Sequence, residues 1–477
     1  MEDARHVPAK LIIIHSNDIH SRLENAARIA SFIAEERNKH GAEHVLALDI
    51  GDHIDRMRPE TEGSDGAVNV ELLNEAGYDA VTLGNNEGLT YTPDIIGNVY
   101  RERAKFPVVC ANLHRLPGDA SPDWLLPNVV IRRGGLNVGL IGVTANFHDF
   151  YTLIGWKSGD PLTAVAEQVG RLRANVDIIA VMSHVGLNFD RKLAETVPGI
   201  DLIMGGHTHH LLEEPLVIGG TTICAAGKHG EYAGRVEISV DEAGRPVMRA
   251  SCVASEGWAE SPKAADLIER FRRSASIRLS RVVARLEEPL QASTEGESPL
   301  GNLLAAGLRR WTGTKIGLVN TGQLLEGLPA GDVTEGMLHA LCPSPINPCK
   351  LLLKGSDLLE ALEESLRPEY TEKAIKGFGF RGRVLGSLAV DGMEVVYGGK
   401  DGGIVSVTVG GEPLESEKLY EVGTIDMFTF KIGYESLARS EQIIYYLPEF
   451  IRHVLAEELQ DKQALGDCRR KRWVKQA

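Results

Sequence analysis

The strongest constraint in this sequence is a series of apolar runs in its N-terminal half, each ending in a small polar cluster. Helix-like segments separate the runs. Continuous β-branched and Leu-rich runs are typical of strands buried on both faces of a sheet. The alternation of strand and helix therefore predicts an α/β layered domain. The main runs are KLIIIHSND, HVLALDIGD, AVTLGNN, VDIIAVMSHVG and IDLIMGGHTHH.

The polar clusters contain the residue types that bind divalent metals. Ligands of open α/β sheets bind outside the carboxyl ends of the strands, so the clusters are expected to converge on one edge. Carboxylate and imidazole groups suit Mn, Fe, Co, Zn or Ni. A site for two metals is therefore predicted. The clusters contain Asp18 and His20, Asp52 and His53, Asn85 and Asn86, His184, and His207 with His209.

Local spacing adds detail to this prediction. In DIH and HTH, the first and third side chains would point the same way from an extended segment, so each pair is expected to reach one centre. Asp52 is the expected bridging ligand, because a carboxylate can offer one oxygen to each metal. Glycines beside Asp52, Asn85 and His207 would permit tight turns and close approach of the backbone.

The motifs DIH, GD, GNNE, SHVG and GGHTH, in this order, resemble those of the calcineurin-like metallophosphoesterases. With its second domain, the chain resembles the 5′-nucleotidase family, which includes UDP-sugar hydrolases and 2′,3′-cyclic nucleotide phosphodiesterases. The resemblance implies a β-sandwich with flanking helices, then an α/β substrate domain. It also implies two divalent ions (Mn, Zn, Co or Fe). The first would be held by Asp18, His20, Asp52 and His209, and the second by Asp52, Asn85, His184 and His207.

The predicted domain order is a metallophosphoesterase domain over 1–255, a helical linker over 256–290 and a substrate-binding domain over 291–477. The segment from Ser261 to Glu288 is expected to form one long charged helix. Another helix is expected to open with a capping box, Ser21 to Glu24, and to stop at Gly41. The basic C-terminal stretch is expected to be solvated or frayed.

A dinuclear site predicts phosphoester hydrolysis by attack of metal-bound hydroxide on phosphorus. The leading prediction is a 5′-nucleotidase-like hydrolase acting on nucleotides. The alternative enzyme is a phosphodiesterase or a nucleotide-sugar pyrophosphatase. The non-enzymatic alternative is a metal-containing nucleotide-binding or sensing protein with weak turnover.

One position departs from the family. Where relatives keep a catalytic histidine after the metal-binding asparagine, this chain has Asn86. An asparagine can donate a hydrogen bond to a phosphoryl oxygen, but it cannot deliver a proton. Loss of general acid–base help typically costs roughly 10²–10⁴-fold in rate. His53 and His148 are candidate replacements; otherwise the leaving group needs no acid. GNNEG and PSPINP resemble a cytoplasmic bacterial branch of the family.

The second domain departs from the family as well. The family's NGGGIR segment corresponds to a stretch that keeps Asn320 but has leucine at the arginine position. Phe380 and Tyr434 are the candidates to sandwich a base. Arg381 and Arg383 are candidate contacts for a phosphate or carboxylate.

Charge and hydropathy limit the partners. A net charge of −15 argues against a nucleic-acid polymer, since phosphate binding needs clustered Lys and Arg. No apolar run reaches transmembrane length, and no signal-peptide pattern is present, so a cytoplasmic protein without membrane contact is predicted. The expected partner is a small phosphorylated substrate, a nucleotide. The oligomeric state is left open.

Overall fold

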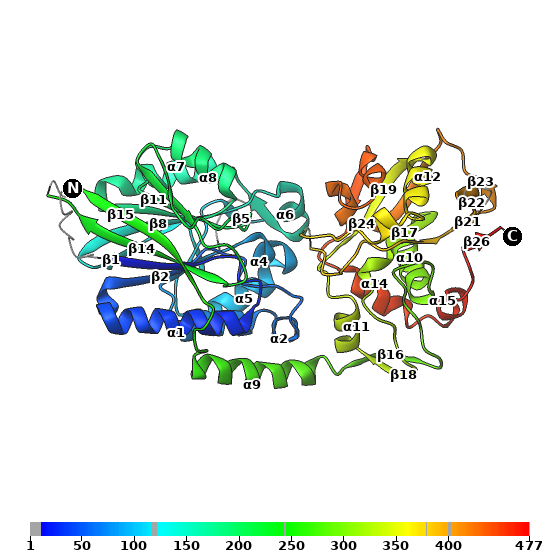
Figure 1. The fold of residues 1–477 in the computed structure, drawn as a ribbon, viewed down its shortest axis with the longest axis horizontal. Coiled ribbons are helices and arrows are strands. Elements are labelled where there is room, and N and C mark those ends of the chain that lie inside the picture. The colour runs from blue at the N-terminus through cyan, green and yellow to red at the C-terminus, as the bar shows by residue number, and fades with distance from the viewer. Residues whose placement is uncertain (1–10, 117–121, 243–244, 378, 399–401, 477) are drawn as a thin grey trace. The chain divides into compact units, whose positions relative to one another are not determined.

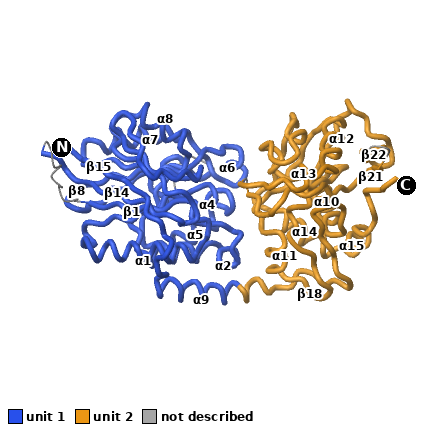
Figure 2. Tube along the Cα trace, viewed as in Figure 1, with its two compact units in different colours: residues 1–275 blue, residues 276–477 orange. Residues whose placement is uncertain are grey.

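The computed structural model describes residues 11–116, 122–242, 245–377, 379–398 and 402–476 of the chain. The chain divides into two compact units, Met1–Ala275 and Ser276–Ala477 (Figure 2). Each unit has its own hydrophobic core, as expected for a chain of this length. Among the described residues, no helix is long and apolar enough to cross a membrane.

Two stacked β-sheets form the centre of the first unit, and helices cover their outer faces (Figure 1). Strand β1 (Leu11–Ser16) shows why. Leu11 and Ile13 pack between the sheets, whereas Ile12 and Ile14 pack beneath the helices. Side chains of a strand point alternately to its two faces, so both faces of this apolar run are buried. The predicted β-sandwich with flanking helices is confirmed.

The central strands of both sheets are parallel, so their carboxyl ends lie at one edge of each sheet. In sheet order, the first sheet comprises β15 (Pro246–Ala254), β14 (Tyr232–Val240), β1, β2 (Val45–Asp49), β3 (Ala80–Thr82), β4 (Val108–Val109) and β6 (Leu125–Leu126). The second comprises β12 (Leu216–Ile218), β13 (Thr221–Ala225), β11 (Leu202–Gly205), β10 (Ile178–His184), β8 (Leu136–Thr144) and β7 (Asn128–Arg133). A small separate sheet pairs β5 (Leu113–Arg115) with β9 (Trp156–Ser158).

Helices cover both outer faces of this sandwich. Those on the first sheet include α1 (Leu23–His40), α3 (Ala67–Ala76) and α5 (Pro93–Arg103). Those on the second are α7 (Pro161–Leu172) and α8 (Leu187–Thr196). The shorter helices are α2 (Pro59–Glu62), α4 (Asn85–Thr90) and α6 (His148–Ile154).

Helix α1 ends at Gly41 as predicted, but its predicted capping box is wrong. The helix begins at Leu23, and its N-cap, Arg22, makes no side-chain cap bond. The Ser21 Oγ instead accepts hydrogen bonds from Asp55 N, at 2.7 Å, and from Asn69 Nδ2, at 3.0 Å. Bonds to a neighbouring loop therefore outcompete the local cap.

The predicted linker helix is also shorter than expected. Helix α9 (Pro262–Arg278) packs on the first unit through Leu267 and Ile268. The chain then forms β16 (Val282–Leu286), which pairs with β18 (Gly331–Thr334) of the second unit. The strand partner that selects this conformation for residues 282–286 lies far along the sequence.

The second unit mixes sheets with helices. Its main sheet comprises, in order, β20 (Leu388–Asp391), β17 (Ile316–Asn320), β24 (Leu419–Ile425), β19 (Pro348–Lys354) and β25 (Ile443–Tyr445). A further sheet comprises β23 (Glu412–Pro413), β22 (Ile404–Val409), β21 (Met393–Tyr397) and β26 (Trp473–Lys475). The helices are α10 (Pro299–Trp311), α11 (Glu335–Leu341), α12 (Gly355–Glu364), α13 (Pro368–Thr371), α14 (Ile451–Glu458) and α15 (Lys462–Asp467). Strand β26 replaces part of the frayed tail expected from the sequence.

Candidate metal centre

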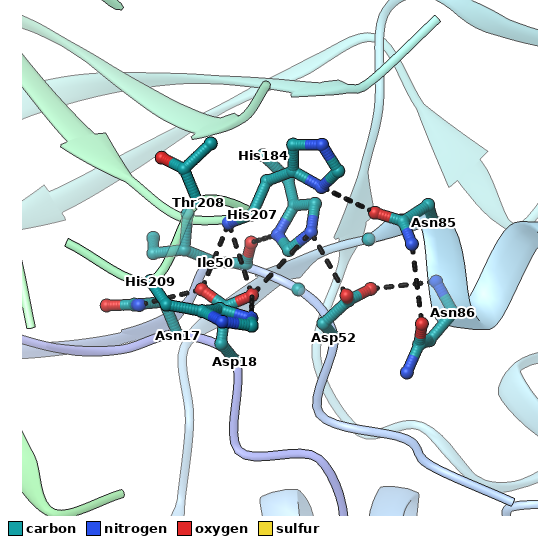
Figure 3. Close-up of polar contacts among 12 residues, drawn as sticks. Asn17, Asp18, Ile50, Asp52, Asn85, Asn86, His184, His207, Thr208 and His209 are labelled. Atoms are coloured by element: carbon teal, nitrogen blue, oxygen red, sulfur yellow. Dashed lines mark hydrogen bonds and ion pairs between the residues drawn. The ribbon is translucent and has the colours of Figure 1, made fainter. Parts of the chain in front are cut away.

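The predicted metal-binding side chains lie together at the carboxyl ends of the strands of the first unit, and Figure 3 shows all of them except His20. Asp18 follows β1, and Asp52 follows β2. Asn85 opens α4 just after β3. From the other sheet, His184 is the last residue of β10, and His207 follows β11. The convergence predicted from the strand-end clusters is therefore present.

One group of ligand atoms comes from Asp18, His20 and His209. The Nε2 atoms of His20 and His209 lie 3.1 Å apart. The Oδ1 atom of Asp18 lies 3.4 Å from His209 Nε2 and 3.8 Å from His20 Nε2. Three donors that face one point at these separations fit a divalent metal that takes imidazole and carboxylate ligands.

A second group comes from Asp18, Asp52 and His184. The Nδ1 atom of His184 lies 2.8 Å from the carbonyl oxygen of Ile50, which turns Nε2 toward the carboxylates. That Nε2 is buried and makes no hydrogen bond of ordinary geometry. It lies 3.4 Å from Asp52 Oδ2 and 3.9 Å from Asp18 Oδ1. A buried imidazole nitrogen of this kind fits a metal ligand held by a carbonyl behind it.

Asn85 and His207 lie beside this second group. The Nδ1 atom of His207 is 2.8 Å from Asn85 Oδ1, and the rings of His184 and His207 are 5.4 Å apart. Asp52 Oδ2 lies 3.4 Å from His184 Nε2 and 3.9 Å from His20 Nε2, between the two groups. Asp18 Oδ1 also faces both groups, so the bridging role of Asp52 stays a prediction.

Left-handed backbone brings these side chains together. Of the seven predicted ligands, Asp18, His20, Asp52, His207 and His209 have φ between 47° and 71°. The extended conformation predicted for DIH and HTH is therefore wrong. Bonds such as Asp18 N to Gly51 O, at 3.0 Å, hold the turns. Such backbone costs free energy in residues with a Cβ, and it clusters at functional sites.

Two glycines allow the ligand loops to touch. A Cβ at Gly84 would lie 2.0 Å from Asp52 Oδ1. Gly51 has φ of +90°, and a Cβ there would lie 2.5 Å from the backbone nitrogen of Gly84. The Gly84 nitrogen is backbone, and Asp52 Oδ1 is held by the backbone nitrogen of Asn86 at 2.8 Å, so neither neighbour can move away cheaply. The predicted close approach of the backbone is confirmed at these two positions.

Glu87 supports the site, although its residue type alone did not single it out. Its buried carboxylate accepts hydrogen bonds from the backbone N–H groups of Asp52, Gly84 and Ile54, at 3.0, 2.9 and 2.9 Å. It thereby joins the loop after β2 to the loop after β3. The available signal was an acidic residue in the first turn of a helix that opens directly after a metal-binding loop.

The ionisable side chains of the centre shift one another's pKa values. Burial by itself lowers the pKa of His184, but the neighbouring Asp52 and Asp18 outweigh it and raise this pKa to about 10. Burial and the nearby His184 lower the pKa of His207 to about 4. Without metal, His184 is therefore protonated near neutral pH, whereas His207 is neutral.

Metal binding is therefore expected to release about one proton per chain near neutral pH, because a metal ligand must be neutral imidazole. His184 keeps its proton at pH values below its pKa of about 10. The apparent affinity for the metal should therefore rise as the pH rises toward about 10. Calorimetric titration with Mn²⁺ in two buffers of different ionisation enthalpy measures the release. His184→Ala should reduce it. Equal heats in both buffers for the unaltered chain would contradict the assignment.

The candidates for the catalytic acid differ in position. Asn86 lies within the centre, and its backbone nitrogen donates to Asp52 Oδ1 at 2.8 Å. His53 is buried, Asn69 Nδ2 lies 3.2 Å from its Nδ1, and burial lowers its pKa to about 3. It is therefore neutral at physiological pH and unsuited to deliver a proton. His148 is an exposed residue at the start of α6.

The predicted substrate contacts of the second unit are mostly structural. Asn320 is fully buried and donates to the carbonyl of Leu385 at 2.6 Å. Tyr434 is 0% exposed and stacks on Tyr370, with ring centroids 6.0 Å apart. Phe380 is 4% exposed and belongs to the core. In this arrangement Tyr370 covers the ring of Tyr434, and the sandwich of a base between Phe380 and Tyr434 stays a prediction.

The two arginines differ from these core residues. Arg383 is exposed, whereas Arg381 is half-buried and its backbone nitrogen donates to Ser344 Oγ at 3.0 Å. A guanidinium at the surface is accessible to a phosphate or carboxylate group. Their role as substrate contacts stays a prediction.

The chain matches two family models. Residues 11–211 match the calcineurin-like phosphoesterase model, and residues 282–438 match the 5′-nucleotidase C-terminal domain. The chain is 37% identical over 459 residues to the uncharacterized metallophosphoesterase YunD of Bacillus subtilis, covering 94% of this chain and 99% of that protein. It is 26% identical to bovine 5′-nucleotidase over 450 residues, covering 82% of this chain and 76% of that protein.

Solved structures share the two-domain fold. A putative 5′-nucleotidase from Staphylococcus aureus has a TM-score of 0.68 at 16% identity, covering 98% of this chain and 100% of that one. A 5′-nucleotidase precursor from Thermus thermophilus has a TM-score of 0.60 at 24% identity, covering 98% and 99%. At these identities the likeness concerns the fold alone. From the family models and the similarity to YunD, the chain belongs to the 5′-nucleotidase family of calcineurin-like metallophosphoesterases, which are hydrolases.

Proposed function

We propose that this chain hydrolyses phosphoesters of nucleotides at a centre of two divalent metal ions. The observation that carries the proposal is the convergence of two groups of ligand atoms that share Asp18: His20 and His209 in one, and Asp52 and the buried His184 Nε2, 3.4 Å from Asp52 Oδ2, in the other. The donor set, imidazole and carboxylate, suits Mn, Zn, Co or Fe.

The residues would divide between two ions. Asp18, His20, Asp52 and His209 would hold the first, and Asp52, Asn85, His184 and His207 the second. When bound, the ions would supply Lewis-acid activation of the phosphoryl group and of water. The chain itself orients the ligands: Ile50 O fixes the ring of His184, and Glu87 holds the turn that presents Asp52.

Nucleotides are the proposed substrates because of the relatives. One of these relatives is bovine 5′-nucleotidase. Another is the trifunctional nucleotide phosphoesterase YfkN of B. subtilis, which is 27% identical over 413 residues, although the match spans only 27% of that protein. The cytoplasmic location and the GNNEG branch stay predictions. Cell fractionation tests the location.

A second candidate is a phosphodiesterase or nucleotide-sugar pyrophosphatase on the same centre. The observation in its favour is Asn86, which cannot protonate a leaving group and occupies the position where the family motif that this sequence resembles has a histidine. A non-enzymatic sensor is disfavoured, since the chain belongs to a family of hydrolases and has a metal-binding residue type at all seven ligand positions of the motifs.

The experiment is a substrate screen. The purified full chain, loaded with Mn²⁺, Co²⁺ or Zn²⁺, is assayed with AMP, UDP-glucose, 2′,3′-cyclic AMP and bis-p-nitrophenyl phosphate. Metal-dependent turnover of AMP supports the nucleotidase, and turnover of a diester or of UDP-glucose alone supports the second candidate. Absence of turnover with every metal and substrate, both in the unaltered chain and in Asn86→His, would refute both.

A further inference from the structure

The side chain of Asn86 is fully engaged inside the metal centre. Its Nδ2 lies 3.0 Å from His20 Nδ1 and donates to the carbonyl of Ile54 at 3.1 Å. Its Oδ1 accepts from Asn85 Nδ2 at 3.3 Å, and its backbone nitrogen donates to Asp52 Oδ1 at 2.8 Å. Asn86 therefore contacts predicted ligands of both ions. To donate to a substrate, its amide would have to give up one of these bonds.

A carboxylate also lies near the Nδ1 atom of His20. Asp55 Oδ2 lies 3.6 Å from His20 Nδ1, and Asp55 is only 2% exposed. Asp55 is itself held, because its Oδ1 accepts from Met57 N at 2.9 Å and its backbone nitrogen donates to Ser21 Oγ at 2.7 Å. His20 is thus bracketed at Nδ1 by Asp55 and Asn86, while its Nε2 faces His209.

This bracket has a chemical purpose if His20 binds a metal. An imidazole that binds through Nε2 carries its proton on Nδ1, and that proton needs an acceptor. Asp55 Oδ2 is the nearest carboxylate oxygen to this nitrogen. Turning the Asn86 amide by 180° would present its oxygen as a second acceptor, at the cost of its hydrogen bonds with the Ile54 carbonyl and with Asn85 Nδ2. A histidine at position 86 would instead place an imidazole ring in the space that the Asn86 amide occupies beside His20.

We infer that Asn86 and Asp55 are positioning residues that orient His20 toward the first metal, and that Asn86 does not act on the leaving group. This rests on the proposed metal centre. The leaving oxygen then departs without a proton from this position, so the centre favours substrates whose leaving group is already a weak base. Phosphoanhydrides and aryl phosphates belong to that class. Among the proposed nucleotide substrates, those with a phosphoanhydride are therefore expected to react faster than a nucleoside monophosphate such as AMP, whose leaving group is a ribose oxygen.

The first test measures metal binding, not turnover. Competition with a chromophoric chelator gives the affinity for each Co²⁺ ion, and the visible Co²⁺ spectrum reports its coordination. Asn86→Leu and Asp55→Ala are each expected to lower the affinity for one of the two Co²⁺ ions by about 10–100-fold. Asn86→Asp, which keeps an acceptor oxygen, should restore most of the affinity. Unchanged affinity and spectrum in Asn86→Leu would overturn the positioning role.

A matched control is Asn112→Leu. Asn112 is buried, and its Nδ2 donates to the carbonyls of Thr144 and Gly159, at 2.8 and 3.2 Å, outside the metal centre. Its loss should lower stability without changing Co²⁺ affinity. If Asn112→Leu weakens Co²⁺ as much as Asn86→Leu does, the effect is general loosening of the unit, and the inference fails.

The second test measures dependence on the leaving group. For the unaltered chain, kcat should fall by at least about 10²-fold from p-nitrophenyl phosphate to an alkyl phosphate, the range that an acid would otherwise supply. If kcat does not change along this series, the inference that the leaving group departs without a proton is overturned. Absence of turnover with every substrate would instead refute the proposed function, and the Co²⁺ measurements would still decide the positioning role.

One other histidine requires a control. The ring of His229 lies 5.9 Å from that of His20 and is half-buried. His229→Gln should leave the slope of the leaving-group series unchanged. A steeper slope in this variant would identify His229 as the acid and would overturn the inference that the leaving group departs unaided.

Discussion

Replacement of Asp52 by alanine is expected to lower kcat/KM by about 10³-fold or more and to remove at least one bound ion. Asp52 Oδ2 lies 3.4 Å from His184 Nε2 and 3.9 Å from His20 Nε2, so its loss would remove a ligand from both ions if Asp52 bridges them as predicted. It also leaves the His184 ring without the carboxylate that contributes most to raising its pKa. Metal content by mass spectrometry and turnover of bis-p-nitrophenyl phosphate measure the two effects.

The control for this variant is Asp123→Ala. Asp123 is an exposed aspartate that pairs with Arg101 at the surface, at 2.7 Å. It should keep both ions and full turnover, since exposed ion pairs contribute little. If Asp52→Ala still binds two ions per chain with unaltered affinity, Asp52 is not a bridging ligand.

Replacement of Glu87 by alanine is expected to destabilise the first unit by about 3–6 kcal/mol, because three backbone N–H groups lose their acceptor. These groups belong to Asp52, Gly84 and Ile54, and the carboxylate that binds them is 1% exposed. Urea denaturation followed by tryptophan fluorescence measures the loss. Metal affinity should fall as well, because the turn that presents Asp52 loses its support.

A graded variant sharpens this result. In Glu87→Gln, one carbonyl oxygen remains, so it can still accept from Asp52 N and Gly84 N, but its NH₂ group faces Ile54 N. An intermediate loss is therefore expected. Glu335→Ala removes a partly exposed glutamate paired with Arg281 and should cost less than about 1 kcal/mol. Equal stability of Glu87→Ala and the unaltered chain would show that water or backbone shifts satisfy the three N–H groups.

The metal-binding residue types were predictable because each stands at the end of its own apolar strand. Parallel strands place their carboxyl ends on one edge, so residues as distant as Asp18 and His207 were expected to meet. Their local backbone was not predictable in the same way. Asp18 and His20 adopt φ of 52° and 47°, and the bonds that hold these turns come from a distant loop.

Other errors have the same origin. Residues 282–286 were expected to continue a charged helix, but pairing with residues 331–334 makes them a strand. The burial of Tyr434, a predicted contact for a base, was not indicated either: Tyr370 stacks on its ring, and its hydroxyl donates to the Gly386 carbonyl at 2.6 Å. In each case the partner lies too far along the chain for a local pattern to indicate it.

By itself, the sequence determined the layered α/β fold and the donor set of the metal centre, because strand periodicity and ligand chemistry are local properties of residues. The tertiary structure decided how those donors are held and oriented. Glu87 as an anchor of the ligand loops, and the contact of Asn86 with His20, depend on hydrogen bonds between segments that only folding brings within 3 Å or so of each other. Hydrogen bonds are short and directional, so their partners are set by packing and not by order along the chain.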